Sequence, residues 1–315
     1  MSRTRSAGTG FEIGPLVPLK GGDGEAVTAW RERIATLGAP HATWWIGGLR
    51  SEVELPNVRV AGARWSDDGR RILAGTGWID VGQATWEASP AVSGLVTAPP
   101  PGGGAVEIRA TSWSADARHV AALLAWSGPR PPDGSTPNAT IAIVDPARPS
   151  ASGDAPVEVA APGASAVRIV GDRVVVAAPT VRAFSFDGTE VAALDATPGT
   201  PRGLAGGNGA DPVLVFDRDW SIRVVDPGSW SVLAHWPGSF LDAIVVEGGG
   251  LIGVGQAGTI VAARLGAGGV EEIGRAETGI GAARLAATGD GRLVILGAGP
   301  EPVHTVEYRL RARSG

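Results

Sequence analysis

The sequence predicts an all-β fold made of repeated four-stranded antiparallel units, and three observations lead to this prediction. The 315-residue chain contains 48 glycines and 24 prolines without a three-residue period, a density that suits many short strands joined by tight turns. A hydroxyl residue followed by a β-branched residue recurs along the chain, and small polar turns recur independently of it. A hydrophobic content of 43% argues against disorder of the chain as a whole.

The two recurring patterns have nearly the same period. The hydroxyl-led strand begins at intervals of 40, 41, 38 and 46 residues, at Thr140, Thr180, Ser221, Thr259 and Thr305. The polar turns lie near residues 68, 116, 172, 208, 249 and 290, and most of them precede a short apolar strand. Each unit therefore reads as four short strands in about 40 residues, which is typical of a β-propeller blade.

The N-terminal region fits this repeat less well than residues 58–312 do. We expect residues 1–10 to be disordered and residues 11–57 to form an irregular N-terminal blade or an extension. Within residues 11–57, apolar residues spaced by 3, 4 and 3 positions resemble one face of a helix and predict a helix near residues 24–37. These residues are Val27, Trp30, Ile34 and Leu37.

The segment HATWWIGGLRSEVELP that follows predicts a hairpin. Seven blades are favoured, and six blades with an N-terminal extension are the alternative. Strand exchange between the two ends of the chain would close the ring in either case and would remove exposed sheet edges.

Two stretches, ARWSDDGRRILAG and DWSIRVVDPGSWSVLAHWPG, resemble the WD-repeat and related bacterial propeller families. In that pattern a strand ends at an Asp-Gly turn and a later strand closes with Trp-Asp. Here the closing pairs are Val144-Asp145 and Val225-Asp226, and other copies lack the aspartate. His235 is near the place where the family's structural His-Asp network would begin, but the residues do not establish such a network. The resemblance covers about residues 58–312 and implies a propeller that acts as an interaction platform.

Composition narrows the classes of partner and compartment. The formal net charge is −5 and there is no run of lysine and arginine, so we expect no nucleic-acid partner. No apolar run reaches the ~18–20 residues that span a bilayer, and no apolar segment follows the N-terminal arginines, so we expect a cytoplasmic protein without a membrane partner. The absence of cysteine excludes disulfides and thiolate metal sites. The bias toward arginine, alanine and glycine suggests a GC-rich bacterial genome.

The motifs that would carry chemistry have simpler structural explanations. Residues 253–258 match a dinucleotide-binding glycine pattern, but a strand-like TIVAARL follows where that motif needs a helix, so we expect a hairpin turn. The four histidines are far apart in sequence and lack metal-ligand spacing. The carboxylate pairs Asp67-Asp68 and Asp217/Asp219 lie in predicted turns, where aspartate is favoured for backbone hydrogen bonding. We therefore expect no catalytic residue, no metal and no cofactor.

Four of the eleven tryptophans allow a structural prediction. Trp65 and Trp113 occupy equivalent positions before a turn, so we expect them to pack between blades. Trp44 and Trp45 are adjacent on a strand and must point to opposite faces, so one of them is expected to be exposed or to pack against the N-terminal helix.

The connections between the second and third strands of all blades should share one face of the molecule. Two of these connections are long or carry charged and aromatic residues, as binding loops do. We expect a rim that binds a protein partner there, and the alternative is a set of solvated loops without a role. The rim residues are Arg130, Asp133, Arg218, Asp219, Trp220 and Glu301.

These observations favour a non-enzymatic scaffold or adaptor in a bacterial multicomponent system, with a protein partner of unknown identity. The alternative is a propeller enzyme, a lactonase-like hydrolase with a metal-dependent site at the central channel. A third possibility is a lectin-like propeller that binds carbohydrate or peptide, which predicts exposed tryptophans at equivalent positions of several blades.

Overall fold

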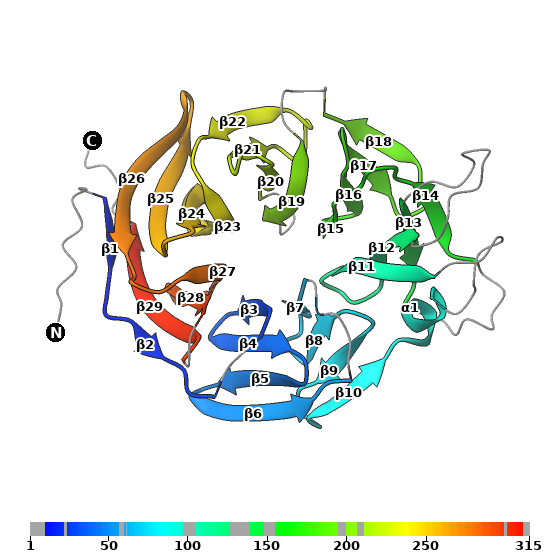
Figure 1. Ribbon diagram of the computed structural model, residues 1–315, viewed down its shortest axis with the longest axis horizontal. Helices are drawn as coiled ribbons and strands as arrows, with labels where there is room; N and C mark the ends of the chain where they lie inside the picture. The colour runs from blue at the N-terminus through cyan, green and yellow to red at the C-terminus, as the bar shows by residue number, and fades with distance from the viewer. Residues whose placement is uncertain are drawn as a thin grey trace. The chain divides into compact units, whose positions relative to one another are not determined.

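A computed structural model of the chain shows an all-β propeller of seven four-stranded antiparallel blades (Figure 1). The last blade also takes strands from the start of the chain. The structure describes residues 10–21, 24–56, 60, 62–96, 105–126, 139–147, 155–194, 200–206, 211–298 and 301–310. In this part of the chain, the structure has no helix long and apolar enough to cross a membrane.

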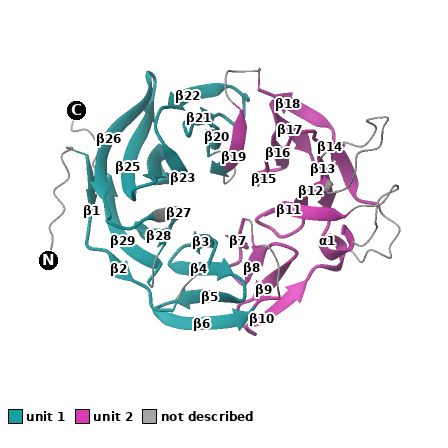
Figure 2. Ribbon diagram, viewed as in Figure 1, with its two compact units in different colours: residues 1–54, 205–315 teal, residues 55–204 magenta. Residues whose placement is uncertain are grey.

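The chain forms two compact units, residues 1–54 with 205–315 and residues 55–204, which Figure 2 shows in different colours. The second unit holds three blades whose strands pair in sequence order. They are β7 (Arg64–Trp65), β8 (Arg71–Ala74), β9 (Gly77–Asp80) and β10 (Thr85–Ala88); β11 (Val106–Trp113), β12 (Val120–Trp126), β13 (Ala139–Val144) and β14 (Val157–Ala160); and β15 (Ala166–Val170), β16 (Arg173–Ala177), β17 (Val181–Ser185) and β18 (Glu190–Ala193).

The other four blades belong to the first unit, except that residues 201–204 of one edge strand, β19, are part of the second unit (Figure 2). They are β3 (Ala26–Trp30), β4 (Arg33–Gly38), β5 (His41–Ile46) and β6 (Leu49–Glu54); β19 (Pro201–Gly206), β20 (Val213–Asp217), β21 (Ile222–Val225) and β22 (Val232–Trp236); β23 (Phe240–Val246), β24 (Gly250–Gly255), β25 (Thr259–Gly266) and β26 (Gly269–Glu277); and β27 (Ala282–Ala287), β28 (Arg292–Gly297) and β29 (Val303–Leu310) with β1 (Phe11–Ile13) and β2 (Val17–Pro18). The 3-10 turn Glu247–Gly249 links β23 to β24.

The two ends of the sequence meet in the last of these blades. β29 pairs with β1 through Phe11 and Leu310, and with β2 through Val17 and Thr305. Phe11 is fully buried in the core of this blade and of its neighbour β23–β26. The N-terminal strands therefore cover the edge of β29, as the expected strand exchange requires.

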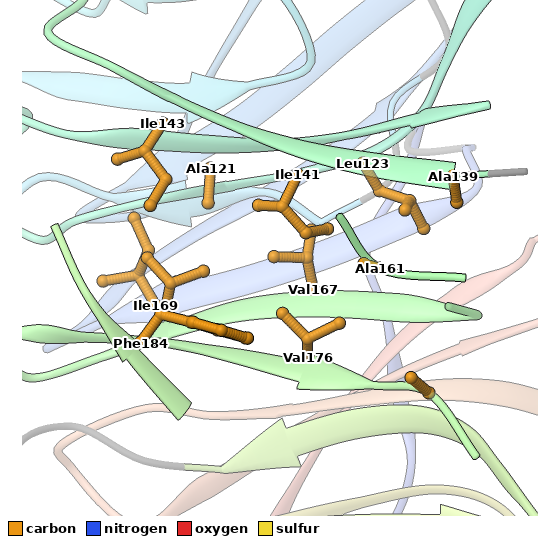
Figure 3. Close-up of a cluster of buried hydrophobic side chains, with 12 residues drawn as sticks. Ala121, Leu123, Ala139, Ile141, Ile143, Ala161, Val167, Ile169, Val176 and Phe184 are labelled. Atoms are coloured by element: carbon orange, nitrogen blue, oxygen red, sulfur yellow. The ribbon is translucent and has the colours of Figure 1, made fainter. Parts of the chain in front are cut away.

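The middle strands of the blades form the core because both of their faces are covered. All five residues of β20 are buried, and β16 is buried from its second residue onward. Such short continuous apolar runs are the sequence pattern of a strand covered on both faces. Figure 3 shows the packing between two adjacent blades of the second unit, where Leu123 and Ile141 face Val167 and Val176. Each such buried side chain contributes about 1.5–3 kcal/mol to folding.

The region 24–38 is a hairpin of β3 and β4, so the predicted helix near residues 24–37 is wrong. The 3-4-3 spacing spans two strands and the turn between them, at Arg31 and Glu32. The β-branched residues Val27, Thr28 and Ile34 favour the strands over a helix. Among the described residues, an α-helix occurs elsewhere, as α1 (Pro90–Gly94), whose N-cap Ser89 accepts a hydrogen bond from the Val92 N–H group. The first complete blade, β3–β6, is regular rather than irregular, and the predicted hairpin forms β5 and β6.

Residues 1–9, which hold most of the predicted disordered segment, are outside the described residues.

The tryptophan predictions had mixed outcomes. Trp65 and Trp113 are both buried, and the Trp113 indole donates a hydrogen bond to the Gly75 carbonyl of the neighbouring blade at 3.2 Å. Trp44 and Trp45 point to opposite faces of β5, yet both are buried, so the expectation that one is exposed or packs on a helix is wrong. Both faces of β5 are buried from Ala42 to Trp45.

Candidate interaction site

The turn between β20 and β21 holds three of the predicted rim residues, Arg218, Asp219 and Trp220. It is closed by hydrogen bonds from the Trp220 N–H group to the Asp217 carbonyl at 3.0 Å and from the Asp217 N–H group to the Ser221 carbonyl at 3.0 Å. Arg218 and Asp219 are exposed, and Trp220 is half-buried. The structure thus places these residues in the connection between a second and a third strand, as predicted.

Trp220 adopts a left-handed backbone conformation with a φ of 71°. In the corresponding turn of the next blade this position is Gly258, with a φ of 77°. A residue with a bulky side chain at this conformation is strained by about 1–2 kcal/mol, and such strain is concentrated at functional sites. The turn fixes a large, partly exposed indole at a position where a glycine would be less strained.

Asp219, Ser221 and His235 form a hydrogen-bonded chain behind this turn. The Ser221 N–H and hydroxyl groups both donate to Oδ1 of Asp219, at 3.0 and 2.7 Å. The Ser221 hydroxyl lowers the pKa of Asp219 most, its backbone N–H adds to this, and the charge of His235 lowers it further, while burial opposes them slightly. His235 Nε2 lies 3.0 Å from the Ser221 hydroxyl oxygen.

These contacts determine which imidazole nitrogen of His235 carries the hydrogen. The single Ser221 hydroxyl hydrogen goes to the ionised Asp219 carboxylate, so the hydroxyl oxygen must accept from His235 Nε2–H. In the neutral form of His235, the imidazole therefore exposes Nδ1 as an acceptor. This order differs from that of a hydrolase triad, because no base takes the proton of Ser221 and its side chain is buried.

A buried ion pair connects β20 and β21 at the base of the turn. Arg223 on β21 donates to Asp217 through Nε at 2.8 Å and Nη2 at 2.6 Å, which makes the pair bidentate. Both side chains are less than a tenth exposed. A bidentate, desolvated pair of this kind fixes the geometry of the two strands at the base of the turn.

Of the other three rim residues the structure describes one, Glu301, and it does not lie in this turn. Glu301 is exposed in the connection between β28 and β29, in a different blade. Near it, burial lowers the pKa of His304, and the charge of Glu301 partly offsets this effect. Arg130 and Asp133 are outside the described residues.

Ser221 and His235 belong to the same cluster, but the rim prediction did not include them. Their sequence separation is 14 residues, and β21 and β22 bring them together through the pairing of Arg223 with His235. In the sequence, Ser221 was visible only as a polar residue after the turn, and His235 only as a histidine near the place of the WD-repeat family's His-Asp network. A prediction of the strand register would have been needed to find the contact.

A concavity of about 390 Å³ lies in the other unit, at two turns equivalent to each other. Its two turns are held together by a hydrogen bond from the Asp67 N–H group to the Ala115 carbonyl at 2.9 Å. Asp68 and Asp116 in this concavity each accept hydrogen bonds from within their own turns. Its lining residues are Ser66, Asp67, Asp68, Arg70, Arg71, Asp80, Ala115, Asp116 and Ala117.

The histidine spacing and the glycine pattern can be compared with the part of the chain that the structure describes. No group of three histidine, aspartate or glutamate side chains there could hold a metal ion. The glycine pattern at residues 253–258 runs from the end of β24 through a turn into β25, as the hairpin prediction required.

Comparisons with known proteins identify the architecture. No protein family and no curated protein matches the sequence. A chain of the mitotic checkpoint complex matches with a TM-score of 0.65 and 10% identity, over 98% of this chain and 93% of that one. The Cps50 (Swd1) β-propeller domain of Myceliophteria thermophila matches with a TM-score of 0.69 and 11% identity, over 96% and 100%. The WD40 β-propeller domain of Doa1 matches with a TM-score of 0.63 and 11% identity, over 97% and 99%. In all, 1351 chains of known structure match, so the shared fold does not by itself indicate one function.

Proposed function

We propose that this propeller is a non-enzymatic interaction scaffold or adaptor in a bacterial multicomponent system. It binds a protein partner through the turn between β20 and β21, with Arg218, Asp219 and Trp220 at the centre of the contact. One of the similar structures was solved as part of a mitotic checkpoint complex, which agrees with a role in assemblies.

The observation that carries this proposal is the strained, partly exposed Trp220 between an exposed charged pair and a histidine. Tryptophan and arginine are the side chains that most often dominate binding energy at protein interfaces. Tryptophan supplies a large contact area at a low cost in side-chain entropy, because it has only two χ angles. The buried ion pair below the turn keeps this surface in place before a partner arrives.

The test is affinity capture of the tagged protein from its native host, with bound proteins identified by mass spectrometry. The double variant Arg218→Ala/Trp220→Ala is expected to lose a stoichiometric partner by roughly tenfold or more, because it removes the two expected hot-spot side chains. The matched control is Arg118→Ala, which truncates an exposed turn arginine in the other unit and is expected to leave capture unchanged. Undiminished capture by the double variant, with both variants folded as the native protein, would contradict the proposal.

A further inference from the structure

The charge of Asp219 is balanced differently from the charges of Asp116 and Asp290, two aspartates in similar turns. In the turns of Asp116 and Asp290 an arginine follows two residues later and contacts the carboxylate, with Nε to Oδ2 distances of 3.9 Å for Arg118 and 2.9 Å for Arg292. Ser221 occupies that position after Asp219 and donates only to Oδ1. Among the described residues, no cation forms an ion pair with Asp219, whose carboxylate is exposed.

The groups around this carboxylate can accept the hydrogen bonds of a cation. Oδ2 of Asp219 is available to accept, and so is Nδ1 of the exposed His235, because Nε2 donates to Ser221. The neighbouring Trp220 provides an indole, and indole rings attract planar cations over their faces. A carboxylate, a neutral imidazole acceptor and an indole together match the planar, donor-rich guanidinium group of arginine.

Arg218 places a positive charge on the same turn and limits which partners fit. An isolated cation beside Asp219 would be repelled by the exposed Arg218 guanidinium. A partner that also carries a carboxylate would satisfy both residues of the turn. Charge complementarity therefore selects a segment with adjacent opposite charges.

We infer that the turn between β20 and β21 binds a partner segment in which an arginine contacts Asp219, Trp220 and His235 and a neighbouring carboxylate contacts Arg218. This inference rests on the proposed function and adds the chemistry of the partner. The exposed charges of the turn set the orientation of the segment, since reversing it would bring like charges together.

The experiment is a titration followed by NMR with protein labelled at the tryptophan indole and histidine ring nitrogens. The probe is N-acetyl-arginine N-methylamide, and the matched comparison is the uncharged citrulline analogue. We expect the arginine probe to shift the Trp220 and His235 signals saturably, and the citrulline probe to bind roughly tenfold more weakly. The Trp220→Phe and His235→Gln variants assign the two signals.

Variants distinguish the contribution of the Asp219 carboxylate to binding from that of the turn that carries it. Asp219→Asn is expected to weaken the arginine probe roughly tenfold, while Asp187→Asn leaves it unchanged. Asp187 is the matched control because Ser185 and Thr189 bind its Oδ1 as Ser221 binds that of Asp219. Arg218→Ala is expected to strengthen binding of the isolated arginine probe, because it removes a like charge.

Equal shifts with both probes, or an undiminished shift in Asp219→Asn, would overturn the inference. So would the absence of a saturable shift with the arginine probe. If such a result came with a captured partner that still depends on Arg218 and Trp220, the proposed function would stand and only the partner chemistry would be wrong. The comparison of the two probes on the unmodified protein decides the matter even if a variant fails to fold.

Discussion

Replacing Arg223 by methionine removes one partner of the buried ion pair below the β20–β21 turn and leaves Asp217 desolvated without its guanidinium. The native pair has two hydrogen bonds, of 2.8 and 2.6 Å, between side chains that are 6% and 3% exposed. Hydrogen bonds to charged groups contribute about 1.5–3 kcal/mol each, so two of them amount to roughly 3–6 kcal/mol. Loss of one partner of a buried ion pair typically destabilises a protein by about 3–5 kcal/mol. We therefore expect a loss of about 4 kcal/mol.

Thermal unfolding followed by circular dichroism measures this effect. A loss of about 4 kcal/mol corresponds to a decrease in Tm on the order of 8 °C for a chain of this size. The matched control is Arg182→Met, which breaks a more exposed pair with Glu190 at 3.5 Å and should change stability by less than about 1 kcal/mol. A Tm change in Arg223→Met no larger than that of the control would refute the reasoning about desolvation.

Two further predictions concern the turns. Ala117 has a φ of 59°, and the equivalent position of the neighbouring turn is Gly69, with a φ of 67°. The variant Ala117→Gly should relieve about 1–2 kcal/mol of backbone strain and lose about 0.5–1 kcal/mol to the greater entropy of glycine in the unfolded chain, so it should raise Tm slightly. A lower Tm would contradict this reasoning. Hydrogen bonds from serine hydroxyls and then from backbone N–H groups lower the pKa of Asp187 and Asp219. Because these pKa values are lower in the folded state, the stability they provide is present above about pH 4 and is lost as the pH falls further, so Tm should be steady from pH 7 to 5 and decrease below about pH 4. A Tm that rises at pH 3 would contradict the assignment.

Much of the fold could be predicted because the signals are local. Turn residues and β-branched strands repeat with a period of about 40 residues, and each repeat became a blade. The helix prediction failed because a 3.6-residue period over 11 residues is also produced by two short strands and a turn. The tryptophan prediction failed because Trp44 and Trp45 do face opposite sides of β5, but both sides are buried.

The candidate site could be predicted only in part. Arg218, Asp219 and Trp220 were found because topology alone places second-to-third-strand turns on one face. His235 was named only as near a possible His-Asp network and was not assigned to the rim, because its contact with Ser221 depends on the register of β21 with β22. That register includes a bulge between Val224 and Val225, which turn signals do not reveal. The backbone strain at Trp220 could not be predicted either, because it depends on the conformation of the turn and not on the residue type.

Amide hydrogen exchange with and without the captured partner tests the central claim most directly, because it maps the contact without any substitution. We expect the partner to protect peptides that cover residues 217–224 and 232–236, where the turn and His235 lie. Protection confined to the turns near Asp68 and Asp116 in the other unit, with the β20–β21 turn unchanged, would contradict the account.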